Sequence, residues 1–400
     1  MVSGSSVGNT VTTGSVTIPM MKKTGYKAEF AGAVEAAAST GGQIMPPIMG
    51  AAAFLMAEYM GISYATVAVT AILPAVLYFT GIYIAVHLEA RKLGLKGIPR
   101  DQLPKLRVLI KKIYLLAPLV VLVVLVSTNM KTMQFSAAVA ILVAILVGLI
   151  NKDDRITPVK IIDALEAGGK GTITVAVACA MAGIVAGCIT VTGLASKLIT
   201  AIVSVSGGHT MIALVLTMLC CIVLGMGVPT TANYCIMAAT CAPILMNPQI
   251  GVPAMAAHFF VFYFGIVADI TPPVALAAYA GSAIAKAPPM KTAFNATKLA
   301  IAAFIVPYIF AMNPAMLLVN VENPFQVVQI VLSSLVGLFG VAAALSGYLY
   351  RPINPLFRLA LVAGGLSMMI PGTLTDVIGL AVVVAVVLLQ RAAAKREAVQ

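Results

Sequence analysis

Two short polar stretches hold the residue types that could do chemistry in this chain. GSSVGNTVTTG spans residues 4–14, and GMGVPTTANYC spans residues 225–235. Each is followed by a Pro-Pro pair in an apolar segment, within TGGQIMPP at 40–47 and within ADITPP at 268–273. Proline removes a backbone donor and clashes with the preceding helical turn, so these pairs predict helix breaks with unpaired carbonyl groups. Such carbonyls, together with hydroxyl groups, suit the binding of a hard cation.

The candidate ligands form two matching sets of neutral oxygens. The first set comprises the side chains of Ser5, Ser6 and Asn9 and the carbonyls near Gly41, Gly42, Ile44 and Pro46. The second comprises Thr230, Thr231 and Asn233 and the carbonyls near Ala268, Ile270 and Thr271. A soft metal would instead call for Cys or His. We therefore expect each half to bind one Na⁺, with an anionic substrate between them at Ser6, Asn9, Thr230, Thr231, Asn233 and Asp269. A single Ser or Thr in a membrane more often bonds a neighbouring helix, and it is the duplication that favours binding.

Two carboxylates lie close to these breaks. Asp269 is deep in an apolar segment beside the second break, and Glu35 lies in the half-helix before the first. Intramembrane carboxylates are costly and usually functional, so Asp269 is a candidate substrate contact, with cation ligand, proton carrier and helix-capping residue left open. Its counterpart in the first half is Gln43. Lys and Arg are absent between Glu29 and Val86 and between Met211 and Ala285, which argues against a highly charged phosphate substrate.

The polar positions are exceptions in a chain that must reside in a lipid bilayer. Of its 400 residues 61% are hydrophobic and 10% charged, and the mean hydropathy is +1.04. This composition excludes a cytosolic enzyme and a nucleic-acid-binding module, despite the net charge of +12. At about 20 residues per crossing, it predicts an all-α polytopic membrane protein with roughly ten to a dozen spans. Apolar segments are expected at 62–88, 108–128, 133–150, 171–191, 209–226, 291–312, 325–349, 355–371 and 374–390.

The basic residues and the duplication together predict a topology. Lys and Arg crowd residues 91–112, which places that loop, and by counting spans the C-terminus, in the cytoplasm. About five crossings then separate the two hairpins, which predicts an inverted repeat. This count takes 171–204 as one crossing with a short helix after Gly193, and two crossings would remove the inversion. The expected division is a first-repeat hairpin and broken helix (1–61), connecting helices (62–208), a second repeat (209–320) and a C-terminal extension (321–400).

The two hairpin tips and their broken helices resemble the large membrane subunit of tripartite ATP-independent periplasmic (TRAP) transporters, the DctM-like permeases. The resemblance rests on SSVGNTVTTGSVTIPMMKKTGY, FAGAVEAAASTGGQIMPPIMGAAAFLMAEYMG, GMGVPTTANYCIMA and FFVFYFGIVADITPPVALAAYAGSAIA. It implies an inverted-repeat elevator-type transporter with two helical hairpins and two broken helices, in a bacterial inner membrane. The family's two Na⁺ sites would correspond to Ser5, Ser6, Gly41, Ile44 and Pro46, and to Thr230, Thr231, Ala268 and Ile270.

The resemblance also implies partners and a transport reaction. The expected partners are a periplasmic substrate-binding protein, of the TAXI type, and a small membrane subunit, which is fused to the large one in the version this chain resembles. The expected cargo is an organic anion such as a C4-dicarboxylate or a related keto or amino acid, with Na⁺ as coupling ion and no cofactor.

Two other functions stay open at this point. Because Met1 lies almost inside the first hairpin tip, we expect an N-terminally truncated form, and a non-transporting remnant is one alternative. An intramembrane hydrolase using Asp269 is the other.

Overall fold

The chain folds into α-helices joined by short turns. The computed structural model describes residues 4–46, 49–99, 106–128, 132–151, 155–321 and 323–397, and these contain no strand beyond one bridge between Tyr348 and Pro352. Within these residues, four helical segments are long and apolar enough to cross a membrane, namely Tyr64–Lys92, Pro289–Met312, Pro324–Ser346 and Thr373–Arg396. A bent pair of helices can supply a fifth span. The protein is therefore an all-α multi-pass membrane protein, as its composition predicts.

The first half consists of a hairpin helix, a broken helix and a long span. These are α1 (Ser6–Thr24), α2 (Ala28–Gly41), α3 (Ala51–Met60) and α4 (Tyr64–Lys92). Ser5 caps α1 by accepting a hydrogen bond from the N–H of Gly8 at 3.1 Å. Gly25, at φ 109°, ends the helix in a conformation that favours glycine. The predicted break lies between α2 and α3, where the helix gives way to turns at Gly42.

The second half repeats this order. It contains α10 (Thr210–Gly225), α11 (Thr230–Thr240), α12 (Ala242–Leu245), α13 (Ala254–Val267), the 3₁₀ turn η3 (Ala268–Ile270), α14 (Leu276–Ala285), α15 (Pro289–Leu299) and α16 (Ile301–Met312). The predicted break is therefore present between α13 and α14. Both hairpin tips are shorter than their polar sequences indicate. Ser6 and Thr230 already begin helices, so these polar residues occupy helical N-termini.

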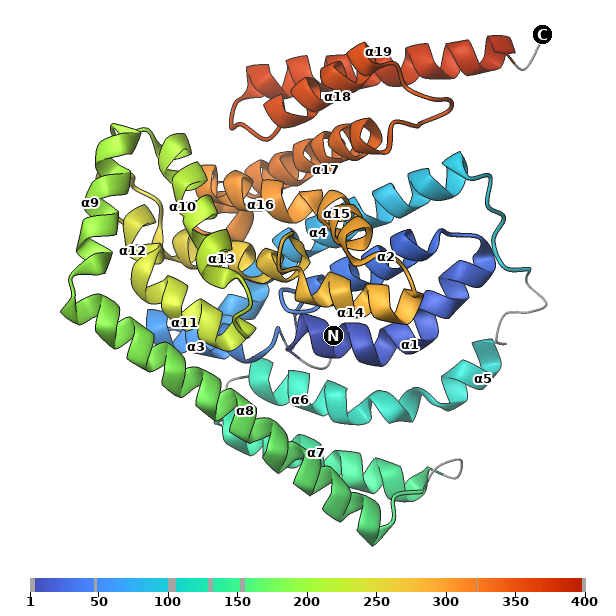
Figure 1. Cartoon of the computed structure of the whole chain (residues 1–400). Helices are drawn as coiled ribbons and strands as arrows, with labels where there is room; N and C mark the ends of the chain where they lie inside the picture. Colours follow the sequence, from blue (N-terminus) through green and yellow to red (C-terminus); the bar gives the residue numbers. More distant parts are fainter. Residues whose placement is uncertain are drawn as a thin grey trace.

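The two halves pack on each other reciprocally. Each hairpin helix lies against the first half of its own broken helix, α1 against α2 and α11 against α13. Each also lies against the second half of the other broken helix, α1 against α14 and α11 against α3. Both breaks therefore lie near the middle of the molecule, between the α1–α4 and α10–α16 segments (Figure 1).

The connecting helices differ from the predicted spans. The expected span 108–128 is wrong as a single helix, because it divides into α5 (Leu106–Lys111), the 3₁₀ turn η2 (Ile113–Leu116) and α6 (Ala117–Ser127). Pro118, in the first turn of α6, has no N–H to donate and disfavours continuation from the preceding turn. Interruptions of this kind explain why the described residues contain fewer long spans than composition alone suggests.

The remaining connecting helices form an outer layer. α7 (Met133–Ile150) packs on α6, and α8 (Pro158–Val191) packs on α11 along one edge of the molecule (Figure 1). After Gly193 comes the expected short helix, α9 (Leu194–Ser206), bent by 68° from the preceding segment of α8.

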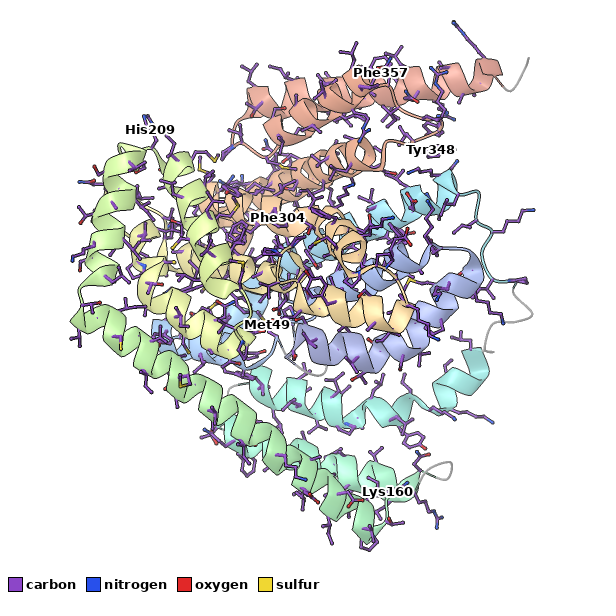
Figure 2. The ribbon with its side chains drawn as sticks, in the orientation of Figure 1. Met49, Lys160, His209, Phe304, Tyr348 and Phe357 are labelled. Atoms are coloured by element: carbon purple, nitrogen blue, oxygen red, sulfur yellow. The ribbon has the colours of Figure 1, made fainter. Side chains whose placement is uncertain are left out.

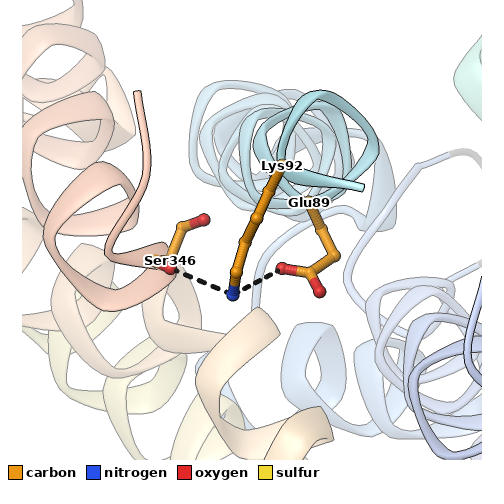
Figure 3. A network of polar contacts seen from close by, with 3 residues as sticks. All are labelled: Glu89, Lys92 and Ser346. Carbon is orange, nitrogen blue, oxygen red and sulfur yellow. Dashed lines mark hydrogen bonds and ion pairs between the residues drawn. The ribbon is translucent and has the colours of Figure 1, made fainter. Parts of the chain in front are cut away.

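The C-terminal extension is a helical layer on the first half. It comprises α17 (Pro324–Ser346), α18 (Pro355–Ser367) and α19 (Thr373–Glu397). At its contact with α4, the Nζ of Lys92 lies 3.4 Å from Oε2 of Glu89 and 3.5 Å from the carbonyl of Ser346 (Figure 3). Lys92 is partly exposed, so this ion pair is worth less than about 1 kcal/mol. The close packing of α17 on α4 stabilises the contact more than this ion pair does.

The main core surrounds the two breaks. Met49, two residues before α3, is fully buried and lies near the centre of the molecule, whereas Lys160 and His209 lie at its edges (Figure 2). The first half of the second broken helix is almost entirely enclosed, since its residues from Met255 to Val267 are all buried. The breaks are thus surrounded by protein, as unpaired backbone groups in a bilayer require.

Two glycines allow a close backbone contact between the halves, and this contact predicts a sensitive site. A Cβ added to Gly281 of α14 would lie 2.6 Å from the carbonyl oxygen of Gly32 in α2. We expect Gly281→Ala to lower the free energy of unfolding by about 1–3 kcal/mol through overpacking. Gly183→Ala, on an open face of α8, is the matched control and should be neutral or stabilising. Thermal unfolding of the detergent-solubilised protein measures both, and equal melting temperatures would contradict the assignment.

Candidate functional site

One hydrogen bond joins the two halves at the level of the breaks. The hydroxyl of Ser6, in the first turn of α1, donates to Oδ2 of Asp269 in η3 at 2.5 Å. Both side chains are buried, with Ser6 1% and Asp269 8% exposed. The structure therefore brings together a residue from the first predicted set and the carboxylate of the second break.

Asp269 has no salt-bridge partner within the described parts of the chain. Its contact with the first turn of α1 takes the place of a salt bridge, because the N-terminus of a helix carries a partial positive charge. The Ser6 hydroxyl adds a hydrogen bond to the charged oxygen, and such bonds are stronger than neutral ones. A carboxylate without Lys or Arg is thus accommodated at the junction of the two halves.

The first break lies directly against the first hairpin tip. A Cβ on Gly4 would be 2.4 Å from the Cα of Gly50, so these two backbones are in contact. Gly41, which ends α2, is packed against the ring of Tyr78, leaving 2.3 Å for an added Cβ. The Tyr78 hydroxyl donates to the carbonyl of Ala37 at 2.7 Å and fixes the ring there. The first hairpin tip thus contacts the chain that leads into α3, while Tyr78 holds the end of α2 in place.

The second break lies against the second hairpin tip in the same way. Asn233 of α11 donates from Nδ2 to the carbonyl of Gly265 at 2.9 Å, next to Gly225 and Ala268. Its Oδ1 is buried and accepts no hydrogen bond from the described residues. The carbonyl of Ile270 accepts a hydrogen bond from Thr297 of α15 at 3.0 Å. Asn233 and Ala268, both predicted from sequence, are thus brought together at the break.

Several predicted groups keep free hydrogen-bonding capacity. The hydroxyls of Thr230 and Thr231, at the start of α11, bond to no other described residue. Gln43 is completely buried, and neither atom of its amide has a partner there. Since buried polar atoms are nearly always satisfied, the unpaired amide of Gln43 is typical of a position that takes up water, an ion or a ligand. Thr230 and Thr231 are half-buried, so their hydroxyls can also bond to water.

The donor set suits a hard cation. The Asn233 oxygen, the Thr hydroxyls and the carbonyl groups at both breaks are neutral oxygens, which alkali and alkaline-earth ions prefer over soft metals. The carbonyls of Ile44 and Pro46 accept no hydrogen bond from the described residues, which leaves them available. Ser6 differs from the prediction in one respect, because its proton is already donated to Asp269. Its oxygen lone pairs stay available to an ion.

Sequence reasoning found the hairpin tips and breaks but not the residues that support them. Tyr78 and Thr297 hold the two breaks from neighbouring helices, and their sequence surroundings are ordinary apolar or helical segments. Gly41 was predicted only as a carbonyl ligand, whereas its missing side chain also makes room for Tyr78. The run of small residues around Gly41 was the sequence feature that could have indicated this close packing.

Comparison with known proteins agrees with this architecture. The model of the family described as tripartite ATP-independent periplasmic transporter, DctM component, matches residues 1–325. This match covers most of the chain, and the protein therefore belongs to the DctM family. No curated protein matches it. Residues 326–400, which include most of α17 and all of α18 and α19, lie outside the family match.

Family membership defines the general activity. The chain is a permease component of a TRAP transporter and thus a transport protein. The family works with a periplasmic binding protein and a small membrane subunit. The hydrolase alternative gains nothing from the geometry, since the hydrogen bond recorded for Asp269 is to a serine hydroxyl, without a His or a second carboxylate among its described partners.

The Ser6–Asp269 bond predicts a measurable effect on stability. In Ser6→Ala the buried carboxylate loses its hydroxyl donor, and we expect the free energy of unfolding to fall by about 1–3 kcal/mol. Ser15→Ala removes an exposed hydroxyl from the same helix and should change it by less than about 0.5 kcal/mol. Thermal unfolding at neutral pH compares the two. A Ser6→Ala protein as stable as Ser15→Ala would show that the bond contributes nothing.

Proposed function

We propose that this protein is the permease subunit of a Na⁺-coupled TRAP transporter that imports organic anions delivered by a periplasmic binding protein. The observation that carries the proposal is the pair of helix breaks with neutral oxygens, each covered by a polar hairpin tip. Na⁺ would bind at Ser5, Ser6, Gly41, Ile44 and Pro46 in one half. In the other half it would bind at Thr230, Thr231, Ala268 and Ile270, close to the unpaired oxygen of Asn233.

The substrate would lie between the two hairpin tips. Ser6, Asn9, Thr230, Thr231 and Asn233 would contact it directly. Asp269 is already hydrogen-bonded to Ser6 of α1, so it would help to shape the site by holding the first turn of α1 in place. The free hydroxyls of Thr230 and Thr231 lie at the positive N-terminus of α11, which suits a carboxylate. C4-dicarboxylates and related keto or amino acids are the proposed cargo, because no Lys or Arg side chain lies in the sequence around the breaks to hold a phosphate.

The reciprocal packing supports an inverted repeat and an elevator movement. α1 lies against α14 and α11 lies against α3, so displacement of either hairpin helix must carry part of the other half with it. A TAXI-type binding protein as the donor of substrate, an inner-membrane location and a cytoplasmic C-terminus complete the proposal.

The direct test is substrate uptake into proteoliposomes. The chain is co-reconstituted with a small membrane subunit and a substrate-loaded binding protein, and uptake is measured with and without an inward Na⁺ gradient. We expect uptake only with the gradient. Equal uptake without it would overturn Na⁺ coupling, and no uptake under any gradient would favour the non-transporting remnant.

A variant tests whether the cation binds at the second break. Thr231→Ala removes one proposed ligand, and we expect the Na⁺ concentration for half-maximal uptake to rise roughly tenfold, the effect of losing about 1.4 kcal/mol of binding. Thr200→Ala, which removes an exposed hydroxyl from α9, is the control. An unchanged Na⁺ dependence in Thr231→Ala, with maximal uptake retained, would remove this residue from the site.

A further inference from the structure

A cavity of about 240 Å³ lies where the C-terminal extension meets the first half of the protein. Its walls come from the start of α2, the end of α4, the second part of α15 and the end of α17. The α17 residues lie outside the family match, so the extension completes the cavity. Pockets that hold drug-sized molecules measure about 300–1,000 Å³. A cavity of this size therefore suits a smaller chemical group.

The cavity lies where two candidate membrane spans end. The spans Tyr64–Lys92 and Pro324–Ser346 each finish at a residue that lines it. Figure 3 shows the Lys92 side chain extending from α4 toward α17, where its Nζ lies 3.5 Å from the carbonyl of Ser346. Phospholipid headgroups occupy the polar region just beyond the hydrocarbon core of a bilayer. The ends of these spans thus put the cavity at the expected level of the headgroups.

Three lysines from three different parts of the chain line the cavity. Lys27 precedes α2, Lys92 ends α4 and Lys298 lies in α15. Lys92 is paired with Glu89 at 3.4 Å. Lys27 and Lys298 are exposed, and neither forms an ion pair with another described residue. Because lysine ammonium groups are common partners of phosphate, two of them are free to bind an anion here.

The N-terminus of α2 adds positive charge to the same wall. Its N-cap residue, Lys27, makes no capping hydrogen bond through its side chain, so the first N–H groups of the helix lack that partner. An uncapped helix N-terminus attracts anions. Glu29, in the first turn, offsets part of this charge. With Glu89 held by Lys92, two lysines and a helix N-terminus face one carboxylate, and the cavity is positive overall.

The cavity also has apolar walls. Phe30 of α2, Leu299 of α15 and Leu345 of α17 line it beside the charged groups. Phe30 is half-buried and Leu345 is exposed, so both offer apolar surface at the mouth. A free phosphate ion gains nothing from such walls, whereas a lipid can place its phosphate among the lysines and its acyl chains along the apolar side chains. Basic pockets between membrane helices bind lipid headgroups in this way.

We propose that this cavity binds the phosphate group of an anionic phospholipid, with Lys27, Lys92 and Lys298 as its cationic ligands. The bound lipid joins the C-terminal extension to α2, α4 and α15. Free phosphate is the other source of the same chemistry, and the apolar walls favour the lipid. The site is separate from the two helix breaks and does not depend on the proposed transport activity.

Thermal unfolding of the protein, purified in a neutral detergent and stripped of lipid, tests this proposal. Phosphatidylglycerol, phosphatidylcholine and inorganic phosphate are titrated in separate experiments. We expect phosphatidylglycerol to raise the melting temperature to a plateau, and the other two to have little effect at the same concentrations. An equal rise with inorganic phosphate would assign the cavity to the free ion and overturn the lipid. An equal rise with phosphatidylcholine, which has no net charge, would overturn the anion site.

Substitutions show whether the cavity is where the lipid binds. Lys298→Gln should weaken the binding of phosphatidylglycerol about fivefold, and Lys27→Gln should do the same. Lys291→Gln neutralises an exposed lysine of the same helix that does not line the cavity, and this matched control should bind like wild type. Glu29→Gln removes a negative charge from the wall and should strengthen binding. Equal weakening in Lys298→Gln and Lys291→Gln would indicate a general attraction of the basic surface for anionic lipid and would overturn the proposal.

Discussion

Backbone groups that are released from a helix inside a membrane must be covered by protein, and this constraint organises the structure. The Pro-Pro pairs interrupt two apolar helices, and lipid offers no hydrogen bonds to the carbonyls that are freed. The protein covers each break with a hairpin tip from the same half, at Gly4 against Gly50 and at Gly225 against Ala268. It also places each hairpin helix against the second half-helix of the other break. Covering the freed backbone groups in this way also brings polar atoms together around the two breaks.

The duplication is not symmetrical in its chemistry, and the differences are informative. Asp269 beside the second break corresponds to Gln43 beside the first. The acid is bonded to Ser6, whereas the amide has no partner among the described residues. The reverse holds earlier in the broken helices, where Glu35, contacted by the hydroxyls of Thr13 and Thr17, corresponds to Val261 in the second half. Among the described residues, each half thus holds one buried carboxylate without a cationic partner, at a different position along its broken helix.

The sequence predicted the features that depend on local chemistry. Pro-Pro pairs, glycine-rich tips and apolar runs have direct local consequences, so the helix breaks and the hairpin helices were found close to their true positions. The predicted span 108–128 was wrong because Pro118 starts a new helix in the middle of an apolar run, where hydrophobicity alone gives no warning. Contacts between segments that are far apart in the sequence could not be predicted from it. The support of Gly41 by Tyr78, the Gly32–Gly281 contact and the Ser6–Asp269 bond all depend on how helices meet in space.

Binding of Na⁺ at the two covered breaks can be measured without transport, by calorimetric titration of NaCl into the purified protein with choline chloride as the reference salt. If both breaks bind the ion as we propose, Na⁺ binding should saturate at about two sites per chain because of the duplication, with one site lost or weakened in Thr231→Ala and the other retained. Heats that do not saturate, or that are the same for Na⁺ and choline, would contradict it.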